Sequence, residues 1–147
     1  MFMKKLLKKL GAKYIVTILL LLLAGSGILY DFLRSKTFRI EMLSMTPEVA
    51  VADSRLPVTI TVRVSRRGEP CQNHYLYVIN NGGGQLKGNR ILTDADGMAE
   101  IIYYPYTESM VRPAGPVTIS IKDESNSVFF EIGANLSFVI ELQSKGN

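Results

Sequence analysis

The sequence predicts an all-β domain, an antiparallel β-sandwich of seven or eight strands, preceded by one transmembrane α-helix. An apolar run near the N-terminus is followed by short segments in which apolar and polar residues alternate. Clusters of Gly, Pro, Asn, Asp and Ser separate these segments at about ten-residue intervals, the spacing typical of a sandwich. With 147 residues, the chain has room for one such domain and a short additional element.

The N-terminal apolar run is long enough to cross a membrane. Residues 14–30 are apolar except for Thr17 and Ser26, and the run resumes beyond Asp31 as far as Leu33. At about 1.5 Å per residue, roughly 17 to 20 helical residues span about 26 to 30 Å, the thickness of a hydrocarbon core. The expected membrane anchor consists of the central leucines and one tyrosine at each edge: Tyr14, Leu19, Leu20, Leu21, Leu22, Leu23 and Tyr30.

The charges that flank this run predict its orientation. Five lysines precede it, whereas the basic residues after it are partly offset by Asp31 and Glu41. Because lysine-rich flanks stay in the cytoplasm, we expect a single-pass protein of the plasma (inner) membrane with its C-terminal domain outside. The expected organisation is a basic cytoplasmic tail at 1–13, a transmembrane helix at 14–33, a short linker at 34–36 and the extracytoplasmic domain at 37–147.

A cleaved signal peptide is the alternative interpretation of the same segment. The basic start, the short apolar stretch and the small residues at 24–27 match the plan of a secretory signal with its cleavage point. However, the apolar run resumes with Ile28, Leu29 and Tyr30 beyond the small residues. We therefore expect an uncleaved signal anchor, with the lipid bilayer as a partner.

The rest of the chain is electrically neutral. Five of the 17 basic residues are the lysines before the apolar run, which leaves 12, and 12 of the 13 acidic residues follow Asp31. A neutral domain has no excess of cations for phosphates, so nucleic acid is not an expected partner. One cysteine and one histidine exclude an internal disulfide and are too few for a zinc site, so no cofactor is expected.

The clearest strand signal lies at residues 58–65, where Val58, Ile60, Val62 and Val64 alternate with polar residues. Such alternation is typical of a strand with one buried and one wet face. Comparable runs predict further strands at 38–45, 74–80, 90–93, 98–104, 117–122, 128–132 and 136–143.

Three glycine-containing turns carry a resemblance to a known family. They are Gly68-Glu69-Pro70, Asn81-Gly82-Gly83-Gly84 and Thr93-Asp94-Ala95-Asp96-Gly97-Met98-Ala99-Glu100-Ile101. With the strands that they enter, these turns resemble the bacterial Ig-like domains of the invasin and intimin type, over about residues 57–142. The resemblance implies an Ig-like antiparallel β-sandwich.

A rival family, the carboxypeptidase-regulatory or transthyretin-like sandwich, shares the first and the third of these turns. That family usually has an aromatic residue at the position of Ala99, which favours the Ig-like interpretation. Cys71 and Asn73 depart from the small residues that commonly follow the first turn in Ig-like domains, so the details of that strand are less constrained.

The turn at Asp94 and Asp96 also resembles the start of an EF-hand, which makes these aspartates a candidate calcium site. The twelfth position of that loop, which should be Glu, is Pro105, and no helices flank it. The alternative is a hairpin turn in which Gly97 adopts a positive φ and the aspartates cap backbone amides. The hairpin turn is the favoured interpretation.

No catalytic residues are expected. His74 is the one imidazole available as a base, and Cys71 lies three residues before it. On a strand, residues three apart point to opposite faces, so the two side chains are not expected to act together. We therefore expect the protein not to be an enzyme.

Tyrosines provide the candidate interaction surface. Tyr75 and Tyr77 share a strand face with Ile79, and we expect them to fill the core. By contrast, a Pro-rich connection follows the strand at 98–104, and its residues are candidates for protein contact: Tyr104, Tyr106, Met110 and Arg112.

These features predict a structural or docking subunit of a bacterial envelope complex or surface assembly, with other membrane or envelope proteins as partners. The alternative is a carbohydrate-binding, peptidoglycan-binding or adhesion module on the cell surface. A sugar site would expose aromatic faces in a groove with nearby Asn or Asp, whereas a docking subunit would bury Tyr104 and Tyr106 against another chain.

Overall fold

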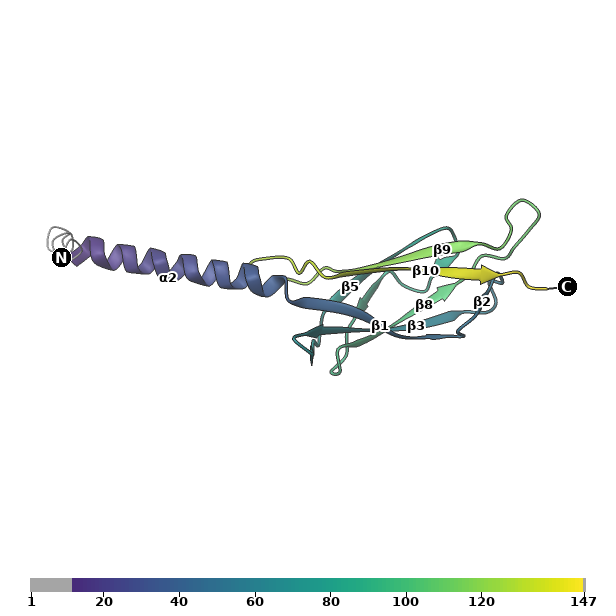
Figure 1. The fold of residues 1–147 in the computed structure, drawn as a ribbon, viewed down its shortest axis with the longest axis horizontal. Helices are drawn as coiled ribbons and strands as arrows, with labels where there is room; N and C mark the ends of the chain where they lie inside the picture. The colour runs from purple at the N-terminus through teal and green to yellow at the C-terminus, as the bar shows by residue number, and fades with distance from the viewer. Residues whose placement is uncertain (1–11, 147) are drawn as a thin grey trace.

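In the computed structural model, which describes residues 12–146, one long helix leads directly into a two-sheet sandwich (Figure 1). Helix α2 (Ala12–Ser35) projects from one end of the sandwich, and the C-terminus lies at the opposite end. The molecule is therefore elongated, with an end near the helix and a free end. Most of the expected basic tail, residues 1–11, lies outside the described residues.

Helix α2 is apolar and exposed along most of its length. The segment Lys13–Ser35 has a mean hydropathy of 2.1, so it is long and apolar enough to cross a membrane. The seven residues expected to anchor the chain lie on this helix and are between 59% and 74% exposed. The helix includes Arg34 and Ser35, so two of the three residues expected to form a linker are helical.

Two five-stranded sheets form the sandwich. In the first sheet the order is β1 (Phe38–Thr46), β3 (Val58–Arg66), β8 (Met98–Tyr104) and β6 (Gln85–Leu86), and β4 (Glu69–Pro70) also pairs with β3. In the second sheet the order is β2 (Ala50–Val51), β10 (Asn135–Gln143), β9 (Pro116–Asp123), β5 (Tyr75–Asn81) and β7 (Arg90–Leu92).

The pairing is antiparallel except at one edge. Strand β1 runs antiparallel to β3, with Phe38 opposite Arg66, and its register shifts between Met42 and Ser44. The two-residue strand β2 pairs parallel with the end of β10. Strands β2, β4 and β6 have two residues each and were not expected, because so short a segment shows no alternation.

The core lies between the sheets and is built from alternate strand residues. On β3, Val58, Ile60, Val62 and Val64 are fully buried, as their alternation predicts, and Ile119 on β9 is equally buried. Full burial of one such side chain stabilises the fold by about 1.5–3 kcal/mol. The predicted all-β sandwich is thus confirmed.

The expected strand at residues 128–132 is wrong. This segment belongs to the loop between β9 and β10, where one isolated bridge joins Asn126 to Glu131. The N–H groups of Val128, Phe129 and Phe130 donate to the Asp31 carboxylate of helix α2 and not to a neighbouring strand. A β-rich composition therefore forms an irregular loop here, because a tertiary contact takes its backbone donors.

The expected core position of Tyr75, Tyr77 and Ile79 is also wrong. On β5 the buried residues are Leu76 and Val78, whereas Tyr75 and Ile79 are 48% and 45% exposed. The two faces of this strand carry equally apolar residues, so alternation could not tell which face is buried. A shift of one residue moves every side chain to the other face.

Candidate functional site

The free end of the sandwich carries a projecting loop, residues 105–115, between β8 and β9 (Figure 1). At its tip, Ser109 and Arg112 form two reciprocal backbone hydrogen bonds of 2.9 and 3.1 Å. Between them, Met110 and Val111 are fully exposed. The tip therefore presents two adjacent apolar side chains on a closed turn.

Side chains within the loop brace this tip. The Tyr106 hydroxyl donates to the Pro113 carbonyl oxygen at 2.9 Å, and the Arg112 guanidinium lies over the Tyr106 ring, 4.0 Å from its centroid. Arg112 also donates to the Gly82 carbonyl oxygen. Arg112, expected as a contact residue, thus holds the loop to the glycine segment after β5.

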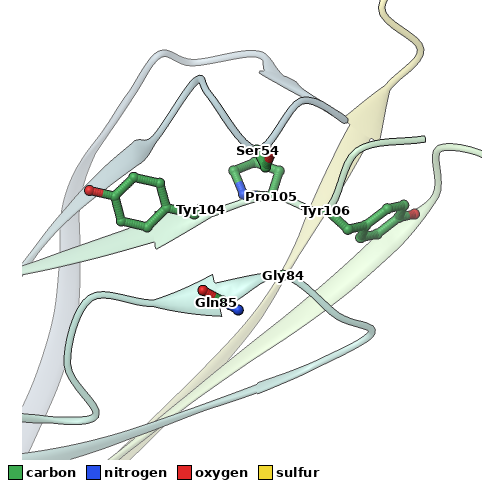
Figure 2. Close-up of a pocket in the computed structure, with 6 residues that line it drawn as sticks. All are labelled: Ser54, Gly84, Gln85, Tyr104, Pro105 and Tyr106. Carbon is green, nitrogen blue, oxygen red and sulfur yellow. The ribbon is translucent and has the colours of Figure 1, made fainter.

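A groove of about 570 Å³ lies beside this loop (Figure 2). Its wall combines aromatic and polar groups from three parts of the chain: Ser54, Gly84, Gln85, Tyr104, Pro105 and Tyr106. Figure 2 shows the rings of Tyr104 and Tyr106 pointing to opposite sides of Pro105. The two rings therefore do not form one flat platform.

Under the groove, Tyr103 is fully buried, and its hydroxyl donates to the Gly83 carbonyl oxygen at 2.8 Å. Burial, together with the neighbouring Tyr106, raises the pKa of Tyr103 to about 12. Gly83 has φ +98°, and a Cβ on it would overlap the Arg112 guanidinium. The glycine segment is therefore part of the support of the loop.

A charged cluster ties the C-terminal segment to the same end. The Lys145 ammonium lies 2.7 Å from the nearly buried Asp53 carboxylate, and the Arg55 guanidinium lies 3.3 Å from it. Hydrogen bonding from Lys145, and secondly from Arg55, holds the pKa of Asp53 well below its usual range. Glu108 of the loop accepts hydrogen bonds from Ser144 and from the Lys145 backbone.

The opposite end contains His74 and Cys71. His74 Nδ1 lies 2.6 Å from Oδ2 of Asp123. Asp123 is fully buried, and its other oxygen, Oδ1, accepts the Ser125 N–H. Both His74 and Cys71 border a pocket of about 300 Å³ that Arg34 of the helix also lines. Residues 71–74 form a turn, with Asn73 at φ 61°, so the opposite faces of a strand are not what separates these two side chains.

This arrangement lacks the features of an activated nucleophile. Burial raises the pKa of the Cys71 thiol, whereas a reactive cysteine needs a lowered one. The carboxylate of Asp123 holds the ring nitrogen of His74 that faces it, and the Cys71 thiol points toward the Glu69 carbonyl oxygen at 3.8 Å. Cys71 and His74 therefore belong to the packing at the junction between helix α2 and the sandwich.

The turn at Asp94 has the hairpin geometry that the sequence favoured. The Asp94 carboxylate accepts the N–H groups of Asp96 and Met98 at 2.9 and 2.8 Å, and Gly97 has φ 71°. Within residues 12–146, no group of three or more His, Cys, Asp or Glu side chains comes together as a metal site would.

The contact that sequence reasoning missed lies where the helix meets the sandwich. Asp31 on α2 is 3% exposed, and its Oδ2 accepts the N–H groups of Val128, Phe129 and Phe130 at 3.2, 2.7 and 3.3 Å. The sequence signal for this contact was the acidic residue inside an apolar run, because an acid in such surroundings requires a partner. Its partner lies 97 to 99 residues away, so no local pattern identifies it.

No protein-family model matches the chain, and no curated protein matches it in sequence. The fold, however, is similar to solved domains of intimin. The TM-score is 0.55 with the D00-D0 domains, at 18% identity, covering 74% of this chain and 48% of that one. It is 0.53 with the D0-D1 domains, also at 18% identity, covering 70% and 48%.

A third similar structure is a C-terminal 282-residue fragment of intimin in complex with the intimin-binding domain of the translocated intimin receptor. Here the TM-score is 0.52 at 20% identity, covering 69% of this chain and 32% of the fragment. The chain spans half or less of the intimin structures that it matches. These similarities confirm the Ig-like fold and the resemblance to the intimin type.

Proposed function

We propose that the chain is a single-pass membrane protein whose Ig-like domain is a structural or docking subunit of a bacterial envelope complex or surface assembly. Helix α2 is its anchor in the plasma membrane, with the N-terminus in the cytoplasm, and the proposal includes no catalytic activity. One observation carries it: Met110 and Val111 are fully exposed on a braced loop at the end farthest from the helix.

The bracing of that loop supports a role in binding. Two adjacent exposed apolar side chains gain free energy when a partner covers them. A loop that is already held in place by Tyr106 and Arg112 loses little conformational entropy on binding. The intimin fragment of similar fold is bound to a protein receptor, which makes protein docking the first use to test for this domain.

Crosslinking from the loop tip in intact bacterial membranes tests the proposal. A photo-crosslinking amino acid at Met110 should form an adduct with one protein. The same group at Val139, which is 56% exposed on β10, is the control and should not. Met110→Ser combined with Val111→Ser should abolish co-purification of that same protein.

Two outcomes would contradict protein docking through the tip. One is the same pattern of adducts from positions 110 and 139, which would indicate nonspecific contact. The other is co-purification that survives both serine substitutions in a folded chain.

A carbohydrate-binding module is the second candidate, and the groove beside Tyr104 favours it. Gln85 and Ser54 supply polar groups there, and two tyrosine rings flank the space. If soluble peptidoglycan fragments bind in this groove, Tyr104→Ala should weaken binding roughly tenfold, whereas Met110→Ser should leave it unchanged. Calorimetric titration of both variants separates this candidate from protein docking.

A further inference from the structure

We propose that the loop between β9 and β10, residues 124–134, is a second membrane-contacting element that inserts Val128 and Phe129 into the lipid interface beside helix α2. This inference rests on the proposed role of α2 as a membrane anchor. It assigns the lipid bilayer as the occupant of an apolar surface that the sandwich leaves uncovered.

The loop is attached to the helix at a defined level. It runs beside the last turns of α2 (Figure 1), and Asp31 Oδ2 accepts the N–H groups of Val128, Phe129 and Phe130. The ring of Phe130 meets the ring of Phe32 edge-on, with centroids 5.4 Å apart. These contacts keep the loop level with Asp31.

That level coincides with the edge of a bilayer. If Leu21, the middle residue of the leucine block 19–23, lies at the bilayer midplane, Asp31 lies ten residues further along, or about 15 Å along the helix axis. The hydrocarbon core is about 30 Å thick, so its boundary falls at the same height. The loop therefore stands where headgroups meet acyl chains.

The side chains that the loop exposes suit this place. Val128 is 60% exposed and Phe129 73% exposed, and neither packs into the core. On the helix next to them, Tyr30 and Leu33 are 64% and 58% exposed. The loop thus continues the apolar surface of the proposed anchor.

The hydrogen bonds from the loop also explain how an acid, Asp31, can lie at this height. A carboxylate at the membrane boundary is unfavourable unless donors surround it. Three successive backbone N–H groups form an anion-binding concavity around Oδ2 of Asp31, and the residue is almost completely covered. The loop therefore turns its polar backbone toward the acid and leaves its apolar side chains facing outward.

Basic residues lie at the same end of the domain. A groove of about 630 Å³ on β1, β3 and the segments beside them has four cationic side chains and one acid in its wall: Lys36, Arg39, Arg63, Arg67 and Glu41. Lys36 directly follows the helix, so this groove lies at the end of the domain nearest the helix. Lipid phosphates are attracted to such a group of cations, which favours the seating of this end on a bilayer.

Tryptophan fluorescence tests the insertion, because the chain contains no Trp. Phe129→Trp is introduced into the full-length chain, which is reconstituted in phosphatidylcholine and phosphatidylglycerol vesicles with lipids brominated near the headgroup end of the acyl chain. The expected result is a blue-shifted emission that the shallow bromines quench and aqueous iodide does not. Val128→Trp provides a second probe on the same loop.

Two matched variants calibrate this readout. Val111→Trp, on the tip at the free end, should emit as an indole in water and respond to iodide alone. Leu21→Trp, in the middle of the leucine block 19–23 of α2, should be quenched by lipids brominated deep in the acyl chain. If Leu21→Trp is not quenched by any lipid, the anchor itself is refuted.

The remaining outcomes concern the loop. If Leu21→Trp is quenched but Phe129→Trp and Val128→Trp respond to iodide like Val111→Trp, the anchor stands and the loop insertion is overturned. If the loop probes are shielded from both iodide and bromine, protein covers this surface, either a second copy or another membrane subunit, and the lipid assignment is equally overturned.

Discussion

Two loops of eleven residues each flank strand β9, one at either end of the sandwich, and they are built alike in one respect. Each exposes two adjacent apolar side chains, Met110 and Val111 at the free end and Val128 and Phe129 beside the helix. They differ in what holds them. The first is braced by its own Tyr106 and Arg112, whereas the second is held by a carboxylate from helix α2.

This difference fits the two uses proposed for the tips. A loop that carries its own braces keeps its shape wherever the domain stands, which suits contact with another protein. A loop held by a helix side chain keeps its position relative to that helix, which suits contact with whatever surrounds the helix. Similar apolar tips can therefore serve different partners, depending on the element that positions them.

Asp31→Ala should have the largest effect, because it removes the acceptor for three backbone N–H groups at once. We expect the amides of residues 128–130 to exchange with deuterium roughly tenfold faster or more, while amides at the free end keep their rates. Asp31→Asn is the control and should cause a smaller change, since its amide oxygen still accepts. Unchanged exchange in Asp31→Ala would show that other contacts hold the loop.

Gly83→Ala should break the brace at the free end. The residue has φ +98°, and its new Cβ would displace Arg112 from Tyr106. We expect a loss of about 1–3 kcal/mol in the free energy of unfolding, measured by denaturant titration.

Gly68→Ala is the matched control for this substitution, because Gly68 also has a positive φ, +88°, and a Cβ there meets nothing within 4 Å. It should cost only the strain of the positive φ, about 1 kcal/mol, and therefore less than Gly83→Ala. Equal losses in the two variants would mean that general glycine effects, and not the Arg112 contact, account for the result.

High pH should destabilise the fold through Tyr103, which lies near the free end. The pKa of Tyr103 is raised from its ordinary value of 10.0 to about 12, so the folded state holds this proton more tightly than the unfolded state. Its contribution is complete below pH 10 and is lost as pH rises toward 12. Melting temperatures of the native chain and of Tyr103→Phe should converge across this window, and parallel curves would exclude a role for Tyr103.

Met110→Ser with Val111→Ser should have the smallest effect on stability, within about 0.5 kcal/mol, because both side chains are fully exposed. Thermal unfolding of this double variant should match that of the native chain. A clear drop in melting temperature would mean that the tip packs against its own domain.

The strand alternation and the apolar run predicted most of the architecture. Residues 58–65 carry alternation on a strand buried on one face, so their pattern identified β3 and its inward residues. On β5 both faces are apolar, so the pattern predicted a strand but chose the wrong face. At the free end, Met110 was expected as a contact residue and is exposed, whereas Arg112 proved to be a brace.

What the amino-acid sequence determined by itself is whatever depends on neighbours in the chain: a helix that is apolar along most of its length, strands with a buried face, and turns at Gly97 and at the glycine segment 82–84. Only the tertiary structure decided which distant groups meet. Residues 128–132 have the composition of a strand, yet Asp31, about a hundred residues earlier, takes their backbone donors. Hydrogen bonds between distant segments follow from how the sheets pack, and the local pattern of residues carries no record of them.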